Sequence, residues 1–167
     1  VMGSKRGFAV IKYAGIIDFP QLLAQIKVWF TQRYYDVNEK EHTEAVKSSG
    51  REVEMEFEAF RKVSDYVRFN INIKIKVLRS IDVLVETASG KEKKQQAEID
   101  VWVRAWMQKN YKGAFKKKEI SKMQDFFRQV YERFIAKPIF DGYKKKIADE
   151  SVALVETIKE ALEMPRR

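Results

Sequence analysis

Three stretches between residues 51 and 108 alternate strictly between polar and apolar residues, as β-strands with one dry face and one wet face do. The clearest runs from Glu52 to Ala59, where four glutamates alternate with four apolar residues. The alternation resumes over residues 68–77 and again over residues 97–106. We therefore predict a meander of long antiparallel strands around which the rest of the chain is organised.

Charged residues suggest how the first two strands of the meander pair. One register places Phe57 opposite Ile71 on the dry face and Glu54 opposite Lys74 on the wet face. Opposite charges across a strand pair contribute about 0.2–1 kcal/mol each, so they help to choose between registers. A slip by one residue is excluded, because it would turn every apolar side chain of the strand to water.

The segments before the meander predict a strand, a helix and a polar strand. Residues 7–17 are apolar at both odd and even positions, which predicts a strand covered on both faces, in a central position or beneath a helix. Asp18 and Pro20 suit the start of a helix, because aspartate caps and proline fits the first turn. Residues 34–47 predict a polar strand or a long extended segment. Apolar residues recur at helical spacing at Leu22, Leu23, Ile26, Trp29 and Phe30.

Residues 66–87 would form a strand of about 70 Å at about 3.3 Å per residue, which is too long for a chain of this size. We therefore expect a bend or bulge near residues 78–80. After Gly113 the apolar period changes to about 3.6, which predicts a helix that Pro138 interrupts. The apolar stripe of that helix comprises Ile120, Met123, Phe127, Val130 and Phe134.

A last helix is expected to start between Gly142 and Asp149 and to end before Pro165. Its predicted buried residues are Val152, Val155, Ile158 and Leu162. The whole pattern predicts an α+β fold: a twisted antiparallel sheet of about five to six strands with a long central meander, packed against an N-terminal helix and two C-terminal helices. We expect residues 7–167 to form one domain and treat residues 1–6 as a tag or a disordered leader.

This order of a strand, a helix, a run of antiparallel strands and a long C-terminal helix resembles that of helix-grip architectures. Such proteins enclose apolar ligands between sheet and helix. The resemblance is one of element order, and it implies a carrier or sensor of an apolar small molecule, held in a cavity between the sheet and the C-terminal helices.

The positive charge is concentrated in one part of the chain. The 167 residues contain 33 Lys or Arg and 24 Asp or Glu, for a net charge of +9. Residues 109–146 alone hold twelve basic and four acidic residues, a net charge of +8. Bases interleaved with aromatic rings favour a polyanionic partner, although a solvated helix face with core aromatics would give the same pattern. The candidate binding residues are Lys116, Lys117, Lys118, Lys122, Phe126, Arg133, Lys144, Lys145 and Lys146.

Two tryptophans lie on the predicted wet face of the last strand. Trp102 and Trp106 share their parity with Asp100 and Arg104. Because large aromatic side chains on such a face are usually covered, we expect the chain's own helices or a second copy of the protein to cover them. The alternative is an interface or ligand platform formed by Trp102, Arg104 and Trp106.

Catalytic and metal-binding signals are sparse. His42 is the only histidine, and although a strand would place it on the same face as Glu44, no second His or Cys exists to complete a metal site. No phosphate-binding loop and no nucleophile-elbow motif is present. We therefore predict a protein that is not an enzyme and uses no metal or cofactor.

The absence of cysteine favours a reducing, cytoplasmic location, and no apolar window is long enough to span a bilayer. Two functions from different classes remain open. The first is a binding or assembly module for nucleic acid, an acidic protein or an anionic membrane surface, as a monomer or a homo-oligomer. The second is the carrier or sensor that the helix-grip resemblance implies.

Overall fold

The computed structural model describes residues 7–88, 90–112 and 122–163, without the side chains of Lys122, Gln124, Asp125 and Ile135. It confirms the predicted α+β fold with an antiparallel sheet. In chain order the elements are β1 (Gly7–Ile17), α1 (Phe19–Gln32), β2 (Asp36–Lys47), β3 (Gly50–Lys62), β4 (Val67–Thr87), β5 (Gly90–Lys109), α2 (Lys122–Val130), the π-helical turn η1 (Tyr131–Ile135) and α3 (Lys137–Ala161).

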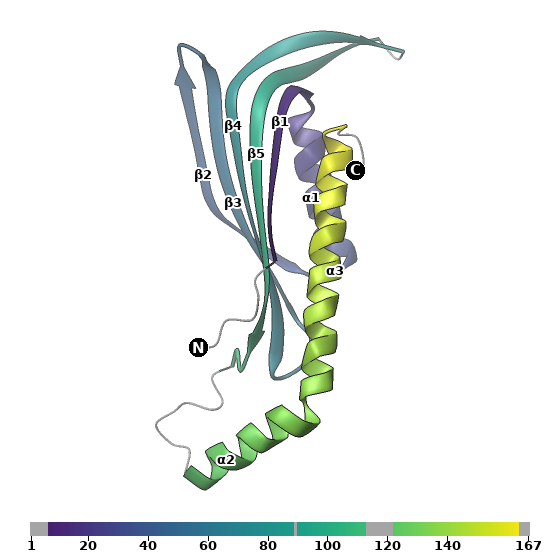
Figure 1. Cartoon of the computed structure of the whole chain (residues 1–167). Helices are drawn as coiled ribbons and strands as arrows, with labels where there is room; N and C mark the ends of the chain where they lie inside the picture. The colour runs from purple at the N-terminus through teal and green to yellow at the C-terminus, as the bar shows by residue number, and fades with distance from the viewer. Residues whose placement is uncertain (1–6, 89, 113–121, 164–167) are drawn as a thin grey trace.

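The five strands form one sheet in the order β1-β5-β4-β3-β2, and every neighbouring pair is antiparallel. Helices α1 and α3 lie side by side on one face of this sheet (Figure 1). Strand β1 is therefore an edge strand, and the predicted central position is wrong. Its odd-numbered residues face the helices, whereas Phe8, Val10 and Ile16 on the other parity are exposed, so the predicted cover on both faces is present on one face only.

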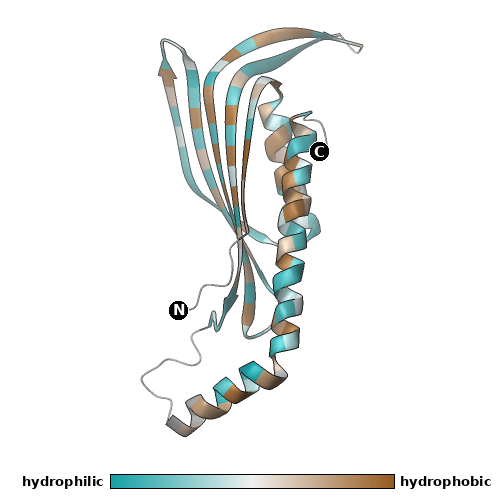
Figure 2. Cartoon of the chain, viewed as in Figure 1, coloured by the Kyte–Doolittle hydropathy of each residue, from teal (hydrophilic) through white to brown (hydrophobic). Residues whose placement is uncertain are grey.

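The core lies between the sheet and the two helices. The alternation predicted from the sequence is visible along the strands in Figure 2, and the apolar parity is the one that faces the helices. We call this the dry face, and the opposite one the open face. At its centre Ile73, Val101 and Val103 are completely buried. Helix α1 covers it with the predicted stripe, of which Leu22, Ile26, Trp29 and Phe30 are buried and Leu23 is half-buried.

The predicted pairing of β3 with β4 has the right parity but the wrong register. Phe57 lies opposite Ile73 rather than Ile71, and Glu54 lies opposite Lys76 rather than Lys74. The register is set by the connecting turn, in which the N–H of Val63 donates to the carbonyl of Val67 at 3.0 Å. Glu54 still forms an ion pair with Lys74, but along the diagonal of the ladder.

The expected bend in the long strand β4 is present. The β4–β5 register shifts between Leu78 and Ile81, and Arg79 between them has a φ of 54°. Beyond this bulge, the end of the β4–β5 hairpin curves over the top of the molecule (Figure 1). Gly50, in the β2–β3 turn, packs against the bulge with a φ of 125°. A Cβ at Gly50 would lie 2.9 Å from the carbonyl carbon of Arg79.

Gly50 and Gly90 form a matched pair for testing this contact, because both have a φ of 125° but a Cβ at Gly90 would meet nothing within 4 Å. Both alanine variants carry backbone strain, and Gly50→Ala adds a clash with backbone atoms that have little freedom to move. We expect Gly50→Ala to reduce the free energy of unfolding by about 1–3 kcal/mol more than Gly90→Ala does, as measured by urea denaturation. Equal losses would show that the contact with the bulge is unimportant.

Helix α3 begins earlier than predicted and buries a different stripe. Pro138 lies in the first turn of α3, where a proline is tolerated. The helix therefore starts before the range of residues 142–149 in which the sequence placed its beginning. Val152, predicted to be buried, is exposed, whereas Ile158 and Leu162 are buried as predicted and Val155 is half-buried. The stripe passes instead through Ser151, whose hydroxyl would lie 3.7 Å from a Cβ on Gly7, so a small residue fits close to β1. The residues of α3 that are buried are Phe140, Ile147, Ser151, Leu154 and Ile158.

A largely buried polar cluster joins the sheet to both helices. Arg61 of β3 forms an ion pair with Glu150 of α3 at 2.7 Å, and the side chains are only 16% and 13% exposed. The hydroxyl of Tyr35, which follows α1, donates to the other carboxylate oxygen of Glu150 at 2.6 Å. Burial and this carboxylate raise the pKa of Tyr35, so its hydroxyl stays protonated. Arg61 also donates to the backbone carbonyl of Arg33 at 2.8 Å, which ties the end of α1 to the sheet.

Candidate binding surface

Helix α2 and the turn η1 point away from the rest of the protein at one end of the sheet (Figure 1). We call these residues, 122–135, the projecting helix. The turn η1 is π-helical, since the N–H of Ala136 donates to the carbonyl of Tyr131 at 2.9 Å, five residues back. The α-helical hydrogen bonding resumes in α3, so the projecting helix is joined to the longest helix of the fold without a loop.

The apolar side chains of the projecting helix face outward. Phe126 and Phe127 are 62% and 63% exposed, and their rings lie 6.0 Å apart. Because isolated exposed apolar residues are common but contiguous ones are not, this surface is the most unusual feature of the described chain. We call it the apolar face, and it comprises Met123, Phe126, Phe127, Tyr131 and Phe134.

The opposite, polar side of the projecting helix is the side that contacts the rest of the protein. Glu132 accepts a hydrogen bond from the hydroxyl of Tyr66, at the β3–β4 turn, and lies 3.8 Å from the ammonium of Lys109. Burial, together with the Glu132 carboxylate, raises the pKa of Tyr66 to about 12. The ring of Tyr66 stacks on Phe140 with centroids 6.0 Å apart. The amphipathic helix is thus inverted relative to an ordinary surface helix, which turns its apolar side to the core.

The predicted basic cluster is divided among several locations. Lys116, Lys117 and Lys118 lie outside the described residues. Lys122 occupies the first position of α2, although its side chain is not described, and Arg133 is exposed on η1. Phe126 comes four residues after Lys122 and seven before Arg133, a spacing that places the three positions along one side of a helix.

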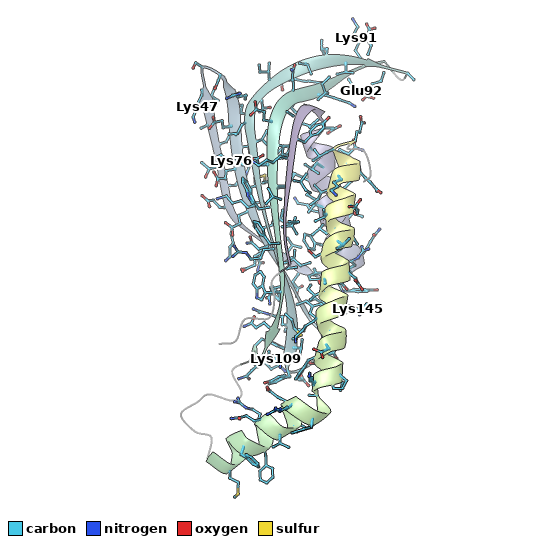
Figure 3. The ribbon with its side chains drawn as sticks, viewed as in Figure 1. Lys47, Lys76, Lys91, Glu92, Lys109 and Lys145 are labelled. Carbon is cyan, nitrogen blue, oxygen red and sulfur yellow. The ribbon has the colours of Figure 1, made fainter. Side chains whose placement is uncertain are left out.

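Lys144, Lys145 and Lys146 lie on α3 rather than on the projecting helix. All three are exposed, and Lys144 forms an ion pair with Asp141 at 3.2 Å. Lys145 comes eight residues after Lys137, the first residue of α3, which corresponds to about 12 Å along the helix axis. Figure 3 shows Lys145 well up the side of α3, whereas Lys109 lies next to the projecting helix. The segment that is basic in sequence therefore does not form one continuous patch among the described residues.

The projecting helix carries most of the predicted apolar stripe, but the sequence did not predict that this stripe faces away from the core. Met123, Phe127 and Phe134 are exposed, Val130 is half-buried, and Ile120 lies outside the described residues. The high net charge of residues 109–146 was the sequence feature that could have indicated an outward apolar side. A helix that packs on a core is seldom flanked by so many basic residues.

Trp102, Arg104 and Trp106 lie on the open face, away from α1 and α3. In the described part of the chain no helix covers them, so that half of the prediction is wrong, and coverage by a second copy stays a prediction. Both tryptophans are nevertheless half-buried by neighbouring strand residues. Trp102 lies between Val10 on β1 and Lys74 on β4, and Arg104 is exposed.

A shallow hollow of about 490 Å³ on the open face is lined by Trp102, Arg104 and Phe8. Its acidic wall is Glu54, whose pKa is lowered by a hydrogen bond from Lys74. The hollow is lined by three cations, Lys74, Lys76 and Arg104, and by two carboxylates, Glu54 and Glu56. Glu54 is already paired with both Lys74 and Lys76, and we do not assign a ligand to the hollow.

His42 lies on the exposed strand β2, where its Nδ1 is 3.5 Å from a carboxylate oxygen of Glu39. Residues 7–88, 90–112 and 122–163 contain no cluster of three His, Cys, Asp or Glu side chains placed to hold a metal ion. Nor does any helix within those ranges have the length and apolar content needed to cross a bilayer.

Comparison of the chain with models of protein families, with curated proteins and with solved structures found no significant match. The resemblance to helix-grip architectures therefore remains one of element order. Any functional assignment has to come from the surface of the protein itself.

Proposed function

We propose that the protein is a non-catalytic binding module that attaches to an anionic membrane surface through the projecting helix. The observation that supports this most strongly is the outward direction of the apolar face, whose five large side chains are each at least 52% exposed. An apolar face in water is unfavourable, and burying it in the boundary between headgroups and acyl chains removes that cost.

The composition of the apolar face favours lipid over the other polyanions. A nucleic acid would stack bases on separate rings and leave much of a continuous apolar surface in water, Met123 included. A bilayer accepts the whole face at once, with flanking Lys and Arg residues at the headgroups. Arg133 lies beside this face, its guanidinium 5.8 Å from the ring centre of Phe134. The bases that lie within or shortly before the projecting helix in the sequence, Lys116, Lys117, Lys118, Lys122 and Arg133, add attraction of about 1 kcal/mol for each one near an anionic surface.

The proposal also specifies a side of the membrane. Anionic lipids give the cytoplasmic leaflet its negative surface potential, and a protein without cysteine is suited to the reducing cytosol. The proposed module therefore acts at the cytoplasmic leaflet as a peripheral protein.

Flotation with lipid vesicles tests this function. We expect the protein to bind vesicles that contain phosphatidylserine, to bind phosphatidylcholine vesicles much more weakly, and to lose affinity as salt is raised, because screening reduces the electrostatic term. The triple variant Lys116→Ala, Lys117→Ala, Lys118→Ala should bind anionic vesicles more weakly, by about 1 kcal/mol per lysine.

Two outcomes would contradict the proposal. One is tight binding of single-stranded RNA or DNA together with no binding of anionic vesicles, which would identify nucleic acid as the partner. The other is equal binding of anionic and neutral vesicles by the parent and the triple variant, which would show that the basic residues are only a solvated surface.

A further inference from the structure

The two edges of the sheet differ in how well they are protected against pairing with another chain. Strand β2 forms one edge and β1 the other (Figure 1), and no further strand of the described chain pairs with the outer side of either. An edge strand presents a row of unpaired backbone N–H and C=O groups, which accept another strand unless charges, prolines, bulges or a short length prevent it. The residues of each edge therefore indicate which one can accept a further strand.

Strand β2 carries the usual protection. Six of its twelve residues are charged, and all twelve are exposed, so its two faces offer no apolar surface to a partner strand. A bulge between Glu39 and Glu41 also interrupts its register with β3. This edge is protected against the addition of a strand.

Strand β1 has none of this protection. Its eleven residues include one charged residue and no proline, and its register with β5 is unbroken. The charged residue, Lys12, forms an ion pair at 3.4 Å with Asp100 of β5, and so leans away from the outer side of the strand. Phe8, Val10 and Ile16 are 58%, 43% and 49% exposed on the open face. Natural proteins seldom leave such a long, regular and apolar edge uncovered.

We propose that β1 pairs with the β1 strand of a second copy of this chain, in antiparallel orientation, and joins the two five-stranded sheets into one. The partner follows from the two edges. A strand that is apolar at both odd and even positions fits a partner of the same kind, and β1 itself is such a strand. The charged edge β2 does not fit it, so copies do not add head to tail. The twofold pairing closes the assembly, because both outer edges of the joined sheet are then the protected strand β2.

The charge of Lys12 selects the register of this pairing. Even-numbered residues must lie opposite even-numbered ones, so that the open faces of both copies lie on the same side. A twofold axis at Lys12 would place two lysines opposite each other, which is unfavourable. An axis at Tyr13 separates the lysines and places Val10 opposite Ile16 of the second copy. Residues 9–17 of each copy then pair through about eight to ten hydrogen bonds, which is the usual number for a specific interface.

Sedimentation of the full chain over a range of concentrations tests the proposal. We expect a reversible equilibrium between monomer and dimer, with no larger species. Val10→Lys should weaken the dimer at least about tenfold, because a charge on the edge opposes pairing. Val46→Lys adds the same charge to β2, where Val46 is 82% exposed, and should leave the dimer unchanged. A monomer at every concentration, open-ended growth, or equal losses in the two variants would overturn the proposal.

Disulfide formation tests the register without a charge on the edge. The chain contains no cysteine, so single cysteine variants report one pair of positions at a time. A mixture of Val10→Cys and Ile16→Cys should form a disulfide between the two chains, because residues directly opposite in a ladder have Cα atoms about 4.5–5.5 Å apart. Either variant alone should not, since identical positions would lie about 20 Å apart. No disulfide in the mixture, or an equal yield from either variant alone, would overturn this pairing.

The pairing does not depend on the proposed attachment to membranes, and the two can fail separately. The triple variant Phe126→Ser, Phe127→Ser, Phe134→Ser should remain a dimer, and Val10→Lys should still float with anionic vesicles. A dimer that is lost in the triple variant and kept in Val10→Lys would assign the contact to the apolar face and overturn the pairing of β1. A dimer that Val10→Lys weakens but that never floats would reject the membrane function and retain the pairing.

Discussion

Replacement of Glu150 by alanine is expected to reduce the free energy of unfolding by about 3–5 kcal/mol, because it leaves the charge of Arg61 buried without a partner. The 2.7 Å ion pair is shielded from water on both sides, with Arg61 16% and Glu150 13% exposed. The variant also leaves the hydroxyl of Tyr35 without its acceptor. Chemical denaturation followed by circular dichroism measures the loss.

The exposed ion pair between Lys12 and Asp100, at 3.4 Å, provides the matched control. Lys12 is 72% exposed, so Asp100→Ala should change the free energy of unfolding by less than about 1 kcal/mol. A double variant, Arg61→Met with Glu150→Leu, should recover part of the lost stability, because it removes the buried unpaired charge, while the hydroxyl of Tyr35 still lacks its acceptor. If Glu150→Ala proves as mild as Asp100→Ala, the buried pair does not hold α3 to the sheet.

The second large effect is on membrane binding. The triple variant Phe126→Ser, Phe127→Ser, Phe134→Ser should bind anionic vesicles at least about a hundredfold more weakly, because each phenylalanine contributes about 1.5–3 kcal/mol when it is fully buried. Its free energy of unfolding should change little, since all three side chains are already more than 60% exposed. Vesicle flotation and urea denaturation of the same preparation measure the two quantities.

Exposed apolar residues elsewhere control for a general loss of hydrophobicity. Val46 and Leu84 are 82% and 73% exposed on the sheet, so Val46→Ser with Leu84→Ser should leave vesicle binding unchanged. Unchanged binding by the triple phenylalanine variant would exclude the apolar face as the membrane contact. If the parent is a dimer and the triple variant a monomer, the face is instead an interface between two copies.

The sequence predicted the features of the fold that depend on parity and composition. The alternation over residues 52–59 identified β3 and its dry face, because a one-residue slip is costly. The alternation did not predict the register between β3 and β4, because two registers that differ by two residues place the same side chains on the same face. The length of the turn after Val63 selects one of these registers. Likewise, the apolar character of residues 7–17 did not reveal that β1 lies at the edge, because the partner strand β5 is distant in sequence.

The candidate site was predicted in part. Charge and aromatic content identified the segment that contains the projecting helix, but a helical pattern gives the angle between residues and not the direction of the apolar side. That direction depends on tertiary contacts, here the hydrogen bond that the hydroxyl of Tyr66 donates to the carboxylate of Glu132. The buried cluster could have been found from one signal: Arg61 has the parity of the dry face, where a charge requires a partner.

The strand order has a consequence for the time course of synthesis. Ile17, the last residue of β1, pairs with Gln95, so 78 residues are made after β1 before its ladder can begin to form. At the usual rate of about 5–20 residues per second, β1 waits roughly 4–16 s without its partner strand. Over that interval Phe8, Val10 and Ile11 lack the strand that pairs with them in the native sheet. A chaperone that shields β1 during synthesis should therefore raise the yield of native protein more than one that acts after release from the ribosome.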